Sequence, residues 1–135
     1  QASEQQSGLI TLQSKHSLSE TIERLESALE KADIAVFSKI DHAKGAKSVD
    51  LDLNPTTLVI FGTPKIGTPL MQSNPTIGID LPLKALIWET SDKQVYLTYT
   101  DPMWLAKRHN IKDKDAVFEK IDAALHKFAT FATQK

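Results

Sequence analysis

The sequence predicts an α+β fold in which a mostly antiparallel sheet carries helices packed on one face. Two long segments, residues 18–32 and 113–131, place apolar side chains at helical spacing. Five short segments are rich in residues that favour strands, and short or medium connections join them. The order is strand, helix, four strands, helix, which is typical of helices segregated on one face of an antiparallel sheet.

The first strand and the first helix are predicted over residues 8–32. Residues 8–15 read as a strand because Ile10 and Leu12 share one face, with polar residues between and after them. Ser17 is suited to cap the helix, because Glu20 three residues later completes a capping box. The apolar stripe of this helix consists of Leu18, Ile22, Leu25, Leu29 and Ala32. That stripe must pack on the sheet.

The next two strands are predicted at residues 34–40 and 57–61. The segment between them is a loop or one or two loose helical turns, weakened by Gly45. Residues 57–61 (TLVIF) are apolar without alternation, which indicates a strand that is central or buried on both faces. Gly62 and Pro64 end this strand.

The last two strands, residues 85–89 and 94–100, form a predicted hairpin. Residues 91–93 (Ser-Asp-Lys) suit a tight turn between them. A short helix then begins with Pro102 at its first position. The final helix is expected over about residues 113–131, with an apolar stripe of Val117, Ile121, Leu125 and Phe128.

Composition excludes several classes of function. The 135-residue chain has no cysteine, so disulfides, thiolate metal sites and cysteine nucleophiles are excluded. Its 17 acidic and 16 basic residues nearly cancel, which argues against nucleic acid as a partner. No run of 18 apolar residues occurs, so no transmembrane segment is predicted.

The N-terminus suggests an exported protein. The chain begins with Gln, and residues 1–7 (QASEQQS) are polar and lack an apolar pattern. We interpret residues 1–7 as a disordered mature N-terminus left by removal of a signal peptide, followed by a single α+β domain at residues 8–135. This interpretation places the protein in the periplasm or outside the cell. An artificially trimmed chain is the alternative interpretation.

Gly/Pro turns are densest within residues 56–84. Thr68 can cap a short helix that has Pro69 at its first position. A helix start after a buried strand presents free N–H groups that favour anions, and Lys65 adds positive charge. The segment is therefore either a carboxylate or phosphate site, or a helix cap that satisfies only itself. It is not a P-loop, because no Gly-Lys-Ser/Thr follows the glycine spacing.

His42 is the most interesting ionisable residue. It follows a strand beside Asp41, which could orient its imidazole for work as a base or as a metal or haem ligand. The alternative is a hydrogen bond to backbone that ties down the following loop. With His109, Met71 and Met103 it would offer imidazole and thioether ligands suited to copper. Their spacing matches no recognised ligand motif, and Met more often fills gaps in a core.

A second polar group consists of Asp80, Lys84, Tyr99 and Arg108, which could converge beside the central strand. Lys84 opens a strand and Tyr99 closes its hairpin partner, so the two are expected to be neighbours. Such a pair could bind an anionic ligand or tune a proton donor. The alternative is an ion pair of Asp80 with Lys84 or Arg108 that locks the turn. The sequence shows no recognisable Ser-His-Asp catalytic triad.

The two tryptophans have different expected roles. Trp88 lies in an apolar strand and is expected in the core. Trp104 follows Pro102 beside Met103, and an exposed aromatic patch of this kind often marks a protein interface. A dimer contact is expected there or along a strand edge.

Four motifs follow one another along the chain: IDHA at 40–43, LVIFGTPKIGTPLM at 58–71, GIDLPLKALIW at 78–88 and YTDPMWLAKRH at 99–109. In this order they resemble the domain-of-unknown-function 302 family. The resemblance spans residues 8–111. That family usually reads Phe-Gly-Asn-Pro after the central strand, whereas Thr63 stands here in place of the Asn.

The resemblance implies the same element order, a small protein of bacterial or archaeal type, and a homodimer. It implies no activity and no particular cofactor. The recurrent polar positions of the family fall here on His42, Thr68, Asp80, Lys84, Tyr99 and Arg108.

We therefore predict an exported protein that binds a small, anionic ligand in a pocket between the sheet and the helices. The predicted lining residues are His42, Thr68, Lys84, Tyr99 and Arg108. One alternative is a periplasmic metal- or haem-binding protein that uses His42 with Met or His partners. Another is a small acid–base enzyme that uses His42 or Lys84, and a module that only binds other proteins also remains open.

Overall fold

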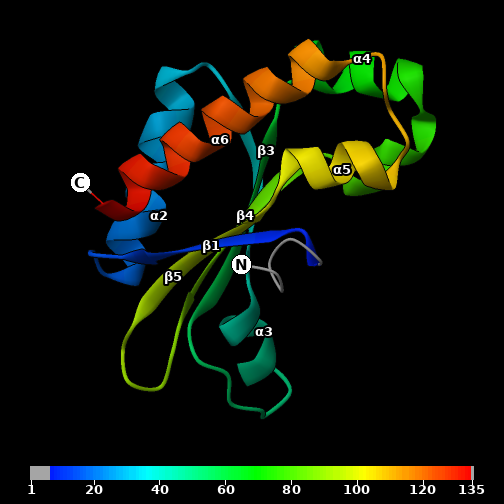
Figure 1. The fold of residues 1–135 in the computed structure, drawn as a ribbon. Coiled ribbons are helices and arrows are strands. Elements are labelled where there is room, and N and C mark those ends of the chain that lie inside the picture. Colours follow the sequence, from blue (N-terminus) through cyan, green and yellow to red (C-terminus); the bar gives the residue numbers. More distant parts are fainter. Residues whose placement is uncertain (1–6, 135) are drawn as a thin grey trace.

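The computed structural model describes residues 7–134, so the N-terminus predicted to be disordered lies, apart from Ser7, outside the described residues. The elements in chain order (Figure 1) are β1 (Leu9–Ser14), α2 (Leu18–Lys31), β2 (Ala35–Asp41), α3 (His42–Lys47), β3 (Thr56–Gly62), α4 (Pro64–Ser73), the 3-10 helix η1 (Pro75–Asp80), β4 (Leu83–Glu89), β5 (Val95–Thr100), α5 (Pro102–Arg108) and α6 (Asp115–Gln134). The predicted α+β class is confirmed.

The five strands form one antiparallel sheet in the order β1-β5-β4-β3-β2. Three consecutive strands, β3, β4 and β5, occupy its centre, and β1 and β2 are its edges. Val59 of β3 lies opposite Ala85 of β4, which in turn lies opposite Tyr99 of β5. All three side chains are therefore on the same face of the sheet.

Helices α2 and α6 cover that face, where Figure 1 shows them side by side. Leu29 of α2 and Phe118 of α6 are fully or almost fully buried against the sheet residues Val59, Ile87 and Leu97. Leu29 and the three sheet residues belong to the apolar stripe and strand segments predicted from the sequence, so most of the main core follows from periodicity. Phe118 lies outside the predicted stripe, which named the half-buried Val117 at this turn of the helix instead.

The two helices are also joined by a polar contact. Arg24 of α2 donates from Nε and Nη2 to the backbone carbonyl of Phe131 in α6, at 3.0 and 2.9 Å. Its guanidinium carbon also lies 4.4 Å from the centre of the Phe131 ring. This contact combines a charge-assisted hydrogen bond with a cation–π interaction.

The opposite face of the sheet is apolar but partly exposed. It carries Leu58, Ile60, Leu86, Trp88 and Tyr96. The rings of Trp88 and Tyr96 stack with their centres 4.8 Å apart, and Trp88 Nε1 donates to Thr98 Oγ1 at 2.9 Å. The prediction that Trp88 belongs to the core is wrong, because it alternates with Ile87, whose side chain faces the helices.

The predicted cap at Ser17 is confirmed, because Ser17 Oγ accepts from the backbone N–H of Glu20 at 3.2 Å. The predicted start of the short helix at Pro102 is confirmed as well, and Asp101 caps it by accepting from the backbone N–H of Met103 at 2.9 Å. Pro102 occupies the first turn of α5. The predicted tight turn joins β4 to β5, and there Lys93 adopts φ +71°.

The start of α4 differs from the prediction. The helix begins five residues earlier than expected, with Thr63 as its cap and Pro64 at its first position, so Thr68 and Pro69 lie inside it. Thr63-Pro64 supplies the same cap-then-proline signal as Thr68-Pro69, and it comes first after the strand. Pro69 removes one helical N–H but does not end this ten-residue helix.

Replacing Leu29 by Ala is expected to lower the free energy of unfolding by about 2–5 kcal/mol, because it leaves a cavity beneath α2. Urea denaturation measures this loss. Leu51, which is 65% exposed, provides the control, and Leu51→Ala is expected to change stability by less than about 0.5 kcal/mol. Equal losses in both variants would contradict the described core.

Candidate functional site

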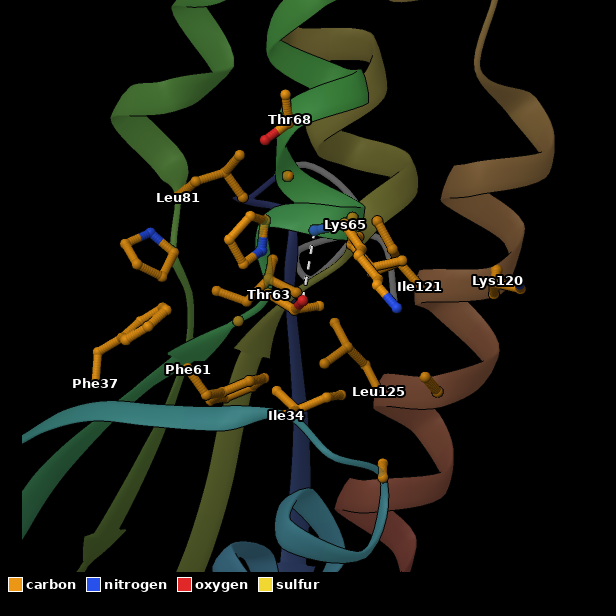
Figure 2. A pocket seen from close by; sticks show the side chains of 18 of the residues that line it. Ile34, Phe37, Phe61, Thr63, Lys65, Thr68, Leu81, Lys120, Ile121 and Leu125 are labelled. Atoms are coloured by element: carbon orange, nitrogen blue, oxygen red, sulfur yellow. Dashed lines mark hydrogen bonds between the residues drawn. The ribbon is translucent and has the colours of Figure 1, made fainter.

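A pocket of about 760 Å³ opens where β3 ends and β4 begins, beside α4, η1 and α6 (Figure 2). Most of its lining is apolar. The main side chains are Phe37, Phe61, Ile66, Leu81, Leu125 and Phe128. Phe61 is 2% exposed and Leu125 is 5% exposed, so the pocket reaches the edge of the buried core.

Two lysines give the pocket a positive rim. Lys65 comes from the first turn of α4 and Lys120 from α6, and both are exposed. Within residues 7–134, neither ammonium group pairs with a carboxylate. Asp33, which precedes β2 at φ +61°, adds one negative charge to the lining. The described charged groups of the lining therefore sum to one positive charge.

The N-terminus of α4 lies at this pocket, but its first backbone groups are already bonded. Pro64 has no N–H, and the N–H of Lys65 reaches Thr63 Oγ1 at 3.4 Å (Figure 2). The N–H groups of Ile66 and Gly67 both donate to the carbonyl of Thr63 at 3.1 Å. The lysine ammonium groups, rather than free N–H groups, are thus the donors available to an anion.

One wall of the pocket is formed by α4 packed on η1. Gly78 of η1 lies against Met71 of α4, and a Cβ at Gly78 would stand 3.3 Å from the Met71 sulfur. Leu81 similarly approaches Gly67, where a Cβ would lie 3.5 Å from Leu81 Cδ1. The small residues therefore allow the two short helices to approach closely beside the opening.

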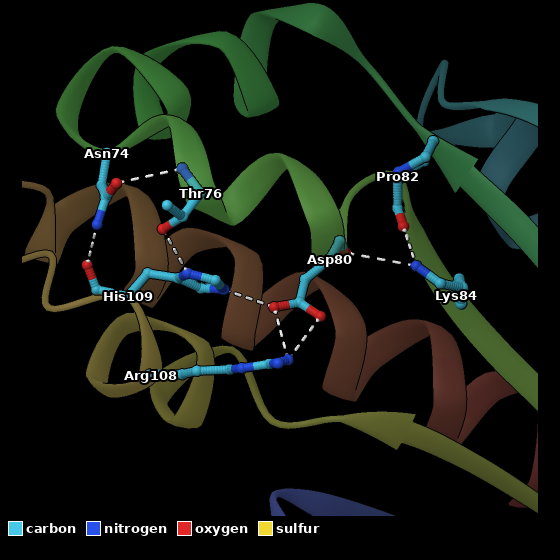
Figure 3. Close-up of polar contacts among 7 residues, drawn as sticks. All are labelled: Asn74, Thr76, Asp80, Pro82, Lys84, Arg108 and His109. Atoms are coloured by element: carbon cyan, nitrogen blue, oxygen red, sulfur yellow. Dashed lines mark hydrogen bonds and ion pairs between the residues drawn. The ribbon is translucent and has the colours of Figure 1, made fainter.

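A polar cluster outside the pocket joins η1 to the end of α5 (Figure 3). Arg108 Nη1 lies 3.1 Å from both carboxylate oxygens of Asp80, and His109 Nε2 lies 2.5 Å from Oδ2. On its other side, His109 Nδ1 lies 2.8 Å from the hydroxyl of Thr76. Asn74 Nδ2 donates to the backbone carbonyl of His109 at 2.6 Å.

His109 is 6% exposed, and both of its ring nitrogens have partners. Because Nε2 faces a carboxylate, it carries a proton and donates to Asp80. Its Nδ1 forms the second hydrogen bond of the ring, with the Thr76 hydroxyl. This cluster confirms the predicted ion pair between Asp80 and Arg108 that locks the turn.

The structure does not bring the five predicted ligand residues together. Thr68 lines the pocket, whereas Arg108 is held by Asp80. Lys84 donates to the carbonyl oxygens of Pro82 at 2.9 Å and of Asp80 at 3.5 Å. The remaining two residues, His42 and Tyr99, lie elsewhere in the molecule.

Tyr99 and Lys84, expected as neighbours, point to opposite faces of the sheet. Tyr99 lies opposite Ala85, so it shares the helix-covered face with Ala85, while Lys84 faces the other way. Tyr99 is 4% exposed within the core. Burial raises its pKa to about 12, and the negative charges of Asp122 and Asp101 add to that increase.

His42 lies at the other end of β3 from the pocket. It begins α3 and is exposed, next to the pairing of Asp41 with Thr57, whereas the pocket lies beyond Gly62. The Asp41 carboxylate accepts from the backbone N–H of Lys44 at 2.9 Å and thus caps α3. Within residues 7–134, no group of three or more His, Asp or Glu side chains is placed to hold a metal ion.

Two important pocket residues, Phe61 and Lys120, were not among the ligand-binding residues predicted from the sequence. Phe61 reads as an ordinary core residue of an apolar strand. Lys120 precedes Ile121 of the predicted helical stripe, and this position at the border of an apolar face was the available signal. Nothing local shows that it stands opposite Lys65.

The chain belongs to the family described as "Domain of unknown function DUF302", whose family model matches residues 10–128. A solved structure titled as an uncharacterized conserved DUF302 protein from Bacillus stearothermophilus has the same fold. The TM-score is 0.83 at 19% identity, over 93% of this chain and 98% of that chain.

Curated relatives with a named function are also similar to the chain. Proteins named fluoride-specific ion channel FluC 1 from Brucella suis and Brucella abortus are each 50% identical to it over 105 residues. These matches cover 78% of this chain but 41% and 39% of the relatives, so the chain spans about two fifths of their length. No helix in the described part of this chain is long and apolar enough to cross a membrane.

Proposed function

We propose that this member of the DUF302 family binds a small amphipathic molecule, with an apolar body and an anionic group. The observation that carries this proposal is the roughly 760 Å³ pocket, whose walls are apolar and whose rim bears Lys65 and Lys120. Small-molecule sites typically occupy about 300–1,000 Å³ and combine apolar walls with a few polar groups. The pocket has this character.

The two parts of the ligand would contribute differently. Burial of apolar surface supplies about 25 cal/mol per Å², so contact with Phe61, Leu125 and Phe128 would provide most of the affinity. The ammonium groups of Lys65 and Lys120 are exposed, and each exposed ion pair contributes roughly 0.2–1 kcal/mol. The lysines would therefore contribute little affinity but would favour a ligand with a negative charge over a neutral or positive one.

Decanoate is expected to raise the melting temperature more than decanol, its uncharged counterpart of equal chain length. A ligand at a hundred times its Kd stabilises a fold by about 2.7 kcal/mol. Removing both charges in Lys65→Gln/Lys120→Gln should weaken decanoate binding about three- to tenfold, consistent with two exposed ion pairs, and leave decanol binding nearly unchanged. Calorimetric titration measures both affinities.

Lys127→Gln is the matched control, because Lys127 is an exposed lysine of the same helix that does not line the pocket. It should bind decanoate as the original protein does. The proposal would be wrong if neither decanoate nor decanol bound, and the role of the lysines would be wrong if the double variant kept full preference for decanoate.

We also propose that the chain forms a homodimer through the open sheet face. This face bears the partly exposed Leu58, Ile60, Leu86, Trp88 and Tyr96. Lys84 is the charged side chain of the described strands on this face, and backbone carbonyls already hold its ammonium group. A second copy meeting this face across a twofold axis would therefore encounter little like-charge repulsion.

Leu86→Lys should convert such a dimer into a monomer, because it would place two lysines opposite one another in an apolar interface. Sedimentation velocity gives the mass, and circular dichroism checks that the variant is folded. Ile79→Lys is the control, since Ile79 is 76% exposed on η1, which is not part of the sheet. A monomeric original protein would contradict the proposal.

The Brucella relatives support a second candidate function, in which this domain works beside a fluoride channel. The observation is that about two fifths of those channel-named proteins align with this chain at 50% identity. We propose that the part of such a relative that does not match this chain can bind this domain when the two are separate polypeptides.

The test uses liposomes that contain the Brucella suis relative with its matching region removed. The domain is expected to float with these liposomes and to stay behind with protein-free liposomes. Equal behaviour with both preparations would overturn the association.

A further inference from the structure

We infer that Asp80 is a positioning residue that sets the shape of the pocket through η1. This inference rests on the proposed ligand-binding function and extends it to a residue outside the lining. Asp80 lies between two lining residues, Gly78 and Leu81, while its own carboxylate faces α5 (Figure 3). The lining residues and the polar cluster thus share one short segment of backbone.

The wall formed by α4 and η1 has two kinds of attachment to the rest of the protein. The first is apolar, because Leu70 and Ile77 are 1% and 0% exposed in the core. Beyond these anchors, α4 and η1 pack chiefly on each other. Because both anchors are buried, we expect loss of a polar contact to shift this wall slightly rather than to release it.

The second attachment is the polar cluster around Asp80. Arg108 and His109, at the end of α5, both hold its carboxylate, with distances of 3.1 and 2.5 Å. Thr76 and Asn74 contact His109 at the start of η1. Because His109 is 6% exposed, its contacts are shielded from water and are stronger than surface contacts.

A second polar contact holds the C-terminal end of α4, at Ser73. Ser73 Oγ donates to the carboxylate of Asp113 at 2.6 Å, and this hydrogen bond lowers the pKa of Asp113. Asp113 is exposed, unlike the His109 ring. The buried cluster is therefore the better candidate for fixing the wall, and the Ser73 contact is the weaker tie.

The width of the pocket mouth depends on where this wall stands. Leu81 reaches across to Gly67, and Met71 fills the space beside Gly78. A displacement of η1 would move Leu81 and Gly78 together, because Asp80 fixes the backbone between them. Loss of the Asp80 charge should therefore broaden the range of ligands that fit and weaken the best-fitting one.

The test uses 1-anilinonaphthalene-8-sulfonate, an apolar probe with one anionic group, and straight-chain carboxylates of increasing length. Asp80→Asn is expected to weaken probe binding about three- to tenfold and to flatten the preference for one chain length. Arg108→Gln should act in the same direction. The double variant should show less than the sum of the two effects, because the residues act as one unit.

Two controls separate positioning from a general loss of stability. Thr21→Ala removes a buried hydroxyl that contacts Ser14 and the carbonyl of Ser17, away from the pocket. Glu89→Gln removes the ion pair with Lys93 at the hairpin. Neither should change probe affinity at a temperature where every variant is folded. Faster amide hydrogen exchange in η1 should accompany weaker binding in Asp80→Asn and Arg108→Gln, and should be absent from the two controls.

Should Asp80→Asn fail to fold, Thr76→Val tests the same cluster by removing the hydroxyl bonded to His109. If the original protein binds the probe and the cluster variants bind it equally well with the same length preference, the positioning role is overturned while the proposed function stands. If the original protein binds neither the probe nor any carboxylate, the proposed function fails, and this inference fails with it.

Discussion

The one-sided covering of the sheet is the constraint on which the rest of the structure depends. Helices α2 and α6 bury a single face, where Leu29 and Phe118 share one buried cluster with Val59, Ile87 and Leu97. Burial of this size supplies most of the favourable free energy of folding. The opposite face, with Trp88 and Tyr96, is left partly exposed.

The pocket follows from how that core ends. After Gly62 the chain leaves the sheet for α4 and η1, and it returns at β4. The segment formed by α4 and η1 lies beside α6 rather than on the sheet. The space between this segment and α6 is therefore bounded by core side chains such as Phe61. Lysines at the rim can keep their charged groups in water while their stems cover apolar surface.

Sequence patterns predicted much of the fold but little of the candidate site. The caps at Ser17 and Asp101 are local, because each involves residues two or three positions apart. Thr68 and the Asp80–Arg108 pair were also predictable, whereas Lys120 was not, because it reaches the pocket only through the packing of α6. The anionic ligand, the homodimer and an exported location stay predictions. So does metal or haem binding at His42, which stands apart from the pocket.

Local sequence patterns specified most of the helices and strands, since periodicity and capping act over a few residues. They left open the segment that becomes α3 and misplaced the start of α4. Tertiary structure decided which faces meet. Lys84 and Tyr99 show the reason, because a change of one residue in strand register moves a side chain to the other face of a sheet. His109 shows it too, because its partners Thr76 and Asp80 are about thirty residues away in the chain and become neighbours only when α5 docks beside η1.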